Sequence, residues 1–187
     1  QNFDLGDVGY QQTEFFIEGT ASAFTNVSEL GSDGFWVLEP AEQAAYKTRI
    51  VVYSPVDPAD FNGIVLMEWL NVTAGFETPP SWGTGQLEMR RGGSVWVGVS
   101  AQLIGIEGSD RGLLPLHLKA VDAARYGSLS HPGDAHSYDI FSQVAQAIRR
   151  PGDIDPLGEL TAEYLIAYGE SQSAGRLVTY VNGLQPL

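Results

Sequence analysis

Cysteine is absent from this chain, and its absence removes several chemistries at once. Without a thiol the chain can form no disulfide, offers no thiolate nucleophile and supplies no cysteine ligand to a metal. Basic residues are also scarce, because 10 Lys and Arg stand against 23 Asp and Glu and give a net charge of −13. Nucleic acids and anionic membranes are bound through basic patches, so we expect neither as a partner.

Long apolar runs are missing as well. No stretch approaches the roughly 18 consecutive apolar residues that a membrane-spanning helix needs. A hydrophobic content of 43% in 187 residues is typical of a globular protein of one domain, and no repeat or linker divides residues 1–187. The first residue is Gln1 rather than methionine, so we expect a processed product and favour a secreted or periplasmic location.

The most informative stretch lies near the end of the chain. The apolar run Tyr164–Tyr168 leads into Gly169-Glu170-Ser171-Gln172-Ser173, after which apolar residues recur every three or four positions. This change of period predicts a strand that turns sharply into a helix. Such a turn can lift a serine hydroxyl to the end of a parallel sheet, where the next N–H stabilises an oxyanion. The pattern therefore indicates Ser171 as a nucleophile and Gln172 as a backbone donor.

Two neighbouring serines compete for this role. Small residues are needed two positions before and after the nucleophile, because strand and helix nearly touch there. Around Ser171 these positions hold Gly169 and Ser173, whereas a frame centred on Ser173 has a serine in the strained preceding position. Ser171 also follows the apolar run directly. The sequence favours Ser171, with Ser173 as the alternative.

The rest of the chain predicts an α/β protein with a mostly parallel sheet. Buried parallel strands read as nearly continuous apolar runs, and helices show a three-to-four residue period. We expect strands at residues 13–19, 46–53, 64–70, 94–100 and 164–168, a short possible strand at 35–38, and helices at 82–91, near 116–124, at 137–148 and after Gln172.

Four stretches carry a resemblance to a known family: Phe61–Val72, Trp96–Gln102, Arg125–Gln143 and Gly169–Leu177, the last with the motif GESQSAGR. Together they resemble a family of bacterial and fungal α/β-hydrolase-domain proteins over nearly the whole chain. The resemblance implies an α/β-hydrolase fold and a serine hydrolase with its nucleophile at Ser171. It implies small-molecule carboxylic esters as substrates and no cofactor.

Only part of a catalytic triad is present in this order. In α/β-hydrolases the triad follows the order serine, acid, histidine along the chain. Here His117, His131 and His136 all precede Ser171, and no His, Asp or Glu follows it. We therefore expect residues 1–187 to be an N-terminal half, containing strands 1–5 and ending just after the nucleophile helix. A C-terminal half, as a second chain or a continuation, is then the expected partner.

Further residues are expected around the serine. The loop after residues 64–70 should place a backbone N–H near Asn71 beside that of Gln172, which completes an oxyanion hole. Trp69, Gln102, His131 and Glu170 are expected to line the pocket. His131 and His136 do not predict a metal site, because Pro132 and Gly133 between them preclude helical spacing.

A buried acid and two other functions complete these expectations. Glu68 ends an apolar strand, where an unpaired carboxylate is costly, so we expect an ion pair with Arg90, Arg91 or Arg176. The main alternative function is a binding or structural module that retains the fold without turnover. An acyltransferase would use the same serine. A histidine out of reach of Ser171 would favour the binding module.

Overall fold

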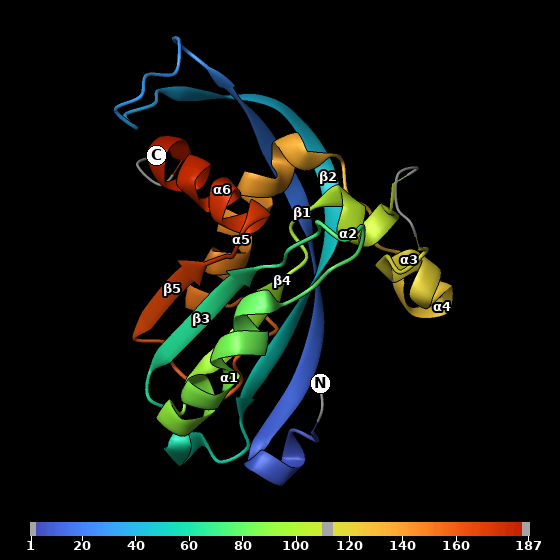
Figure 1. Cartoon of the computed structure of the whole chain (residues 1–187), viewed down its shortest axis with the longest axis vertical. Helices are drawn as coiled ribbons and strands as arrows, with labels where there is room; N and C mark the ends of the chain where they lie inside the picture. The colour runs from blue at the N-terminus through green and yellow to red at the C-terminus, as the bar shows by residue number, and fades with distance from the viewer. Residues whose placement is uncertain (1–2, 110–113, 185–187) are drawn as a thin grey trace.

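The computed structural model describes residues 3–109 and 114–184, which form one mixed sheet with helices on both faces (Figure 1). The strand order is β1-β2-β4-β3-β5. The strands are β1 (Tyr10–Asn26), β2 (Leu38–Pro55), β3 (Ile64–Trp69), β4 (Val95–Val99) and β5 (Tyr164–Tyr168). β1 and β2 pair antiparallel, β2 pairs antiparallel with β4, and β3 runs parallel to both β4 and β5. The predicted α/β class, with helices flanking a sheet, is thus confirmed.

The helices connect the strands and cover the sheet. They are α1 (Pro80–Gly92), α2 (Leu103–Glu107), α3 (Leu118–Val121), α4 (Ala123–Tyr126), α5 (Ser137–Arg149) and α6 (Gln172–Thr179). Short 3-10 turns lie at Gly6–Val8, Pro58–Asp60 and Asp134–His136, and a π turn, Tyr180–Leu184, follows α6. No helix in the described part of the chain is long and apolar enough to span a membrane.

Side chains of the central strands point alternately to the two faces of the sheet, so a hydrophobic core forms on each face. Val95, Val97 and Val99 of β4 face α5, whose apolar stripe includes Phe141 and Val144. Trp96, between these valines, faces the opposite side and packs with Trp82 of α1. Because β4 is an interior strand buried on both faces, its sequence contains no polar side chain other than the Trp96 indole.

The first two strands are longer than expected. Residues 13–19 and 46–53 are the middle of a hairpin in which Tyr10–Asn26 pairs with Leu38–Pro55. The outer parts of both strands consist mainly of polar residues and alanine, which have low strand propensity, so the local pattern did not indicate strands there. A shift of register between Ser22 and Phe24 bends the ladder, and the possible strand at 35–38 is reduced to the start of β2.

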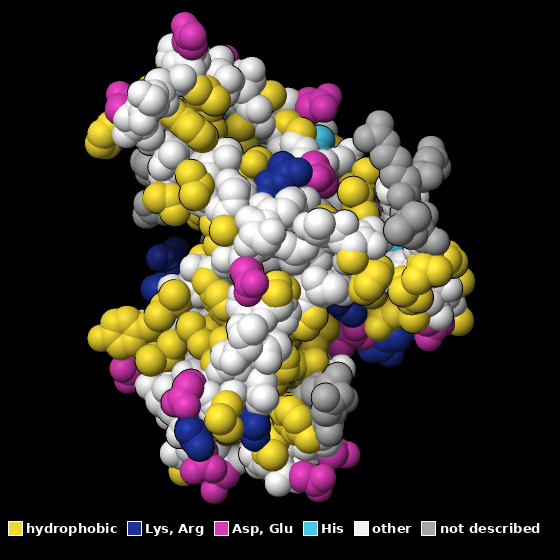
Figure 2. All heavy atoms as spheres, in the orientation of Figure 1, with side chains coloured by type: hydrophobic (Ala, Val, Ile, Leu, Met, Phe, Trp, Pro, Cys, Tyr) yellow, Lys and Arg dark blue, Asp and Glu magenta, His cyan; other side chains and the backbone are white. Residues whose placement is uncertain are grey.

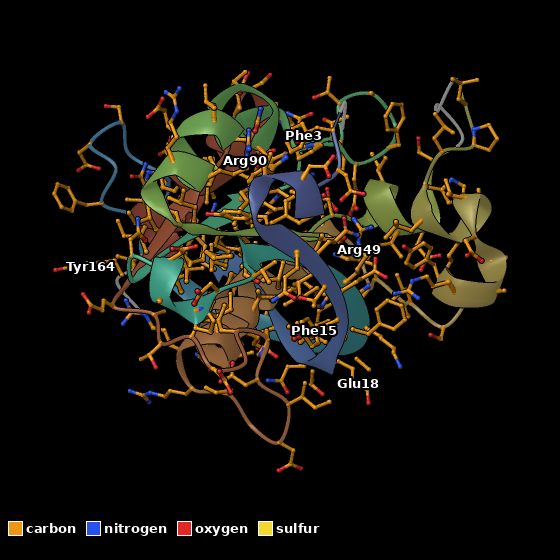
Figure 3. All side chains as sticks on the ribbon, turned by 90° about the horizontal axis from the view of Figure 1, so that it is seen from below. Phe3, Phe15, Glu18, Arg49, Arg90 and Tyr164 are labelled. Carbon is orange, nitrogen blue, oxygen red and sulfur yellow. The ribbon has the colours of Figure 1, made fainter. Side chains whose placement is uncertain are left out.

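The edge strand β5 leaves apolar side chains uncovered. It pairs with β3 along one edge, and Tyr164 is 62% exposed and Ile166 46% exposed. Tyr164 points away from the sheet in Figure 3, and Figure 2 shows hydrophobic side chains gathered on that side of the molecule. An exposed apolar edge strand favours pairing with a further segment or chain.

Candidate active site

The turn between β5 and α6 holds Ser171 in a conformation that L-residues rarely adopt. Ser171 has φ 58° and ψ −119°, and it is the only non-glycine residue with positive φ among those described. Such a conformation costs about 1–3 kcal/mol and is found mainly at functional sites. The small neighbours are required by packing, since a Cβ at Gly169 would lie 2.9 Å from the Cβ of Ser173.

The two serines lie in different environments. Ser171 is exposed at the sheet end, whereas Ser173 is fully buried in the first turn of α6. The Ser173 N–H donates to the Glu170 carbonyl at 3.1 Å, and the Ser173 hydroxyl has no partner among the described residues. A substrate approaching from solvent can therefore reach Ser171 and cannot reach Ser173.

Gln172 begins α6, so its main-chain N–H lies among the unsatisfied donors of the helix N-terminus. Within residues 3–109 and 114–184 this N–H has no acceptor. The partial positive charge at a helix N-terminus also favours an anion at this point. The start of α6 can therefore stabilise negative charge that develops next to Ser171.

The loop after β3 approaches the same turn. The side-chain amide of Asn71 donates to the Glu170 carbonyl at 3.0 Å, which joins the loop to the residue before Ser171. The main-chain N–H of Asn71 is not free, because it donates to the Thr78 carbonyl at 3.0 Å. The next N–H, that of Val72, has no acceptor in the described part of the chain. In this loop the Val72 N–H is therefore available as a donor, and the Asn71 N–H is not.

A hydrogen-bonded network connects the other motifs behind the turn. The Trp69 indole donates to Gln102 Oε1 at 3.0 Å, and Gln102 Nε2 donates to Asp134 at 3.3 Å. Asp134 also accepts from the Leu103 N–H at 2.9 Å and from Arg176 of α6 at 2.7 Å. Trp69 and Gln102 are buried. Through Asp134 their hydrogen bonds link the ends of β3 and β4 to α6.

Two of the three histidines, His131 and His136, are buried, and His117 is half-buried. His131 Nε2 lies 3.0 Å from the Ala101 carbonyl and its Nδ1 accepts from the Gly133 N–H at 3.2 Å, so its ring fastens a loop. Burial lowers the pKa of His131, which keeps the ring neutral. His136 is buried, and His117 packs against Gly108. None of these three histidines hydrogen-bonds to Ser171.

Glu170 and Glu68 have different roles. Glu170 contributes its carbonyl to the turn, while its side chain is exposed. The expected ion pair of Glu68 is wrong: its carboxylate accepts from the N–H groups of Ser81 and Trp82 at 2.9 and 3.1 Å and from the Trp96 indole at 2.8 Å. These donors satisfy the buried charge at the N-terminus of α1, where the helix dipole also favours it.

Sequence reasoning missed one charged group near the site. Glu77, on the loop after β3, accepts from Arg49 of β2 at 2.6 Å and from the Ser100 hydroxyl at 3.0 Å. The available signal was Arg49 itself, a charged residue within the apolar run that precedes Ser54. No group of three or more metal-ligating side chains occurs in residues 3–109 and 114–184.

Comparison with known proteins agrees with this geometry. A family model described as "Alpha/beta hydrolase domain" matches residues 1–187. No curated protein and no solved structure matches the chain. The family match indicates a hydrolase-type function and leaves the substrate open.

Proposed function

The chain belongs to the alpha/beta hydrolase domain family, and on that premise we propose that it is a serine hydrolase acting on carboxylic esters. The Ser171 hydroxyl attacks the ester carbonyl while a histidine takes its proton. The tetrahedral oxyanion collapses, the alcohol leaves with that proton, and an acyl-enzyme remains on Ser171. Water then attacks the acyl group, and Ser171 regains its proton as the acid is released.

The strained backbone of Ser171 is the single observation that carries this proposal. Glycine would adopt φ 58° with less strain than serine, yet this chain has a serine, with its hydroxyl, at that position. The turn presents this hydroxyl at the carboxyl end of β5, beside the unsatisfied N-terminus of α6. In open α/β sheets ligands bind beyond the carboxyl ends of the strands.

Two main-chain donors are proposed for the oxyanion. Gln172 offers its free N–H at the start of α6, and the loop after β3 offers that of Val72 in place of Asn71. The bond from Asn71 to Glu170 keeps this loop beside the turn. A pair of donors fixed before the reaction stabilises the transition state without reorganisation, and loss of one donor typically costs about 100-fold to 1,000-fold in kcat.

The acid and the histidine are proposed to come from a C-terminal half of the same domain. Support comes from the engaged ring of His131 and from the uncovered edge of β5. An apolar hollow of about 330 Å³ lies beside that edge, lined by Tyr168, Gly169, Ala174, Leu177, Val178, Val181 and Asn182. A further segment packed there would cover the apolar surface and could place a histidine within hydrogen-bond reach of Ser171.

Two matched valines test this covering in the complete protein. Val178 on α6 is 57% exposed and Val121 on α3 is 60% exposed in residues 1–187. If both side chains also face solvent in the complete protein, an aspartate should be tolerated equally well at either position. We expect Val178→Asp to lower the melting temperature and esterase activity, because the charge would be buried under the further segment. Val121→Asp should change neither. Equal effects of the two substitutions would contradict a covered surface.

Turnover of short-chain p-nitrophenyl esters tests the proposed reaction. Ser171→Ala should abolish turnover, while Ser173→Ala should retain a measurable rate, because Ser173 is buried behind the turn. Circular dichroism of both variants should match the parent protein. Activity that survives Ser171→Ala would contradict the proposal.

A further inference from the structure

The loop that follows β3 is closed on itself by several hydrogen bonds. Asn71 and Thr78 exchange both main-chain bonds, at 3.0 and 2.8 Å. The Thr73 N–H donates to the Asn71 side chain at 2.9 Å, and the Gly75 N–H donates to the Val72 carbonyl at 3.0 Å. These bonds fix the shape of the loop. They do not fix where the loop lies relative to the sheet.

Contacts from Asn71 and Glu77, near the two ends of this segment in sequence, tie the closed loop to its surroundings. At one end Asn71 donates to the Glu170 carbonyl beside Ser171. At the other end Glu77 Oε2 accepts from Arg49 at 2.6 Å and from the Ser100 hydroxyl at 3.0 Å. Arg49 belongs to β2 and Ser100 directly follows β4, so Glu77 attaches the loop to two strands.

The anchoring group is buried and part of a larger charge cluster. The Glu77 side chain is only 6% exposed, and burial raises its pKa although Arg49 opposes the shift. Arg49 also contacts Glu14 of β1 at 3.4 Å, and Glu14 pairs with Arg125. In Figure 3 the labelled Arg49 lies between the sheet and the segment that carries α2 to α4. The proposed acyl-transfer steps use none of these charges.

We propose that Arg49 and Glu77 are positioning residues that set the loop after β3, and with it the Val72 N–H, at the correct distance from Ser171. The inference rests on the proposed hydrolase function. Val72 directly follows Asn71 and Glu77 directly precedes Thr78, so the two main-chain bonds between Asn71 and Thr78 join them across the base of the loop. A displacement of Glu77 is therefore transmitted to Val72. A misplacement of about 1 Å in a catalytic group can cost about 100-fold in rate.

The anchor also limits which residues can replace it. The Oε1 atom of Glu77 has no partner in the described part of the chain, and a Cβ at Gly105 would lie 2.5 Å from it. The carboxylate thus fills the space left by Gly105 and depends on Arg49 for its countercharge. Removing Arg49 leaves a buried charge that the loop can relieve only by moving towards water.

Four variants of the complete protein test the inference. Glu77→Gln and Arg49→Met should each lower kcat by about 10-fold to 100-fold per active site, with KM changed by less than about threefold. Active sites are counted by fluorophosphonate titration of Ser171. Arg49→Lys should recover part of kcat, because it restores the charge without the second contact. The double variant should lose no more than the worse single variant, since both act through one contact.

A matched control separates positioning from general loss of an ion pair. Lys119 and Glu107 also form a pair of 2.6 Å, on α3 and α2, so Lys119→Met should leave kcat per active site unchanged. A merely structural role for Arg49 and Glu77 would lower stability and the number of active sites, but not kcat per site. That result, or additive losses in the double variant, would overturn the inference.

Hydrogen exchange tests whether Glu77 anchors the loop even if the proposed function is wrong. If the parent protein does not react at Ser171, the hydrolase proposal is wrong. The position of the loop is then tested by the hydrogen-exchange rates of its main-chain amides. Faster exchange at Asn71 and Thr78 in Glu77→Gln than in the parent, with Lys119→Met unchanged, would show that Glu77 fixes the loop. Identical exchange in all three proteins would refute the anchoring.

Discussion

Replacing Ser171 by glycine should stabilise the protein while it removes the nucleophile. Ser171 is held at φ 58° and ψ −119°, a conformation that costs about 1–3 kcal/mol for a residue with a Cβ. Glycine adopts it without strain but loses about 0.5–1 kcal/mol through its larger unfolded-state entropy. Ser171→Ala keeps the strain and also removes the hydroxyl. We therefore expect Ser171→Gly to be about 0.5–2 kcal/mol more stable than Ser171→Ala.

A second serine provides the control. Ser137 begins α5 with φ −55° and ψ −35°, an ordinary helical conformation, and its hydroxyl has no partner among the described residues. There glycine should be about 0.5–1 kcal/mol less stable than alanine, because no strain is relieved. The order of the two variants is thus opposite at the two sites.

Urea unfolding of the complete protein, monitored by tryptophan fluorescence, measures both differences. The comparison requires equal denaturant slopes within each pair, since a changed slope signals a changed unfolded state. A difference of 1 kcal/mol also shifts the melting temperature by about 2–4 °C in a domain of this size. If Ser171→Gly proved less stable than Ser171→Ala, the backbone of Ser171 would not be strained and the argument for the turn would fail.

Four further substitutions test the packing and charges of the site. Gly169→Ala should destabilise the protein by about 1–3 kcal/mol in urea unfolding, because the added Cβ would lie 2.9 Å from Ser173. A Cβ added at Gly175 would meet no atom within 4 Å, so Gly175→Ala should be neutral or stabilising. Glu68→Gln should cost about 2–4 kcal/mol by the same assay, since three donors lose a charged acceptor; an unchanged midpoint would contradict this account of Glu68. Burial lowers the pKa of His131 in the folded state. As the pH drops, the unfolded chain therefore binds a proton at this residue before the folded chain does. The free energy of unfolding should fall as the pH drops below about 6.5 towards the folded-state pKa. His131→Asn should show a weaker pH dependence between pH 7.5 and 5, and an identical profile would show that His131 does not titrate on unfolding.

Local patterns predicted the parts of the site that depend on neighbouring residues. The run Tyr164–Tyr168 and the period of the following helix located the turn, and the sizes of Gly169 and Ser173 placed Ser171 at its tip. All of these features lie within about 20 residues and follow from strand and helix geometry. The same patterns located the strands along the chain, whereas their order in the sheet, β1-β2-β4-β3-β5, was not predicted.

Contacts between distant segments were not accessible in this way. Glu68 was expected to pair with an arginine, but buried N–H donors at the start of α1 satisfy it instead. The sequence of the loop after β3 did not indicate that Asn71 and Thr78 exchange main-chain hydrogen bonds, one of which uses the N–H of Asn71. Arg49 and Glu77 are 28 residues apart in sequence and meet only because β2 lies beside β4. Such pairings depend on the packed fold, which periodicity does not encode.

Fluorophosphonate labelling of the complete protein, followed by peptide mapping, tests the central claim most directly. The reagent forms a covalent bond only with a serine whose hydroxyl is activated and open to solvent. We expect a single adduct on Ser171 and none in Ser171→Ala. Labelling of Ser173, or no adduct at any serine of the folded, complete protein, would contradict the assignment of Ser171 as the nucleophile.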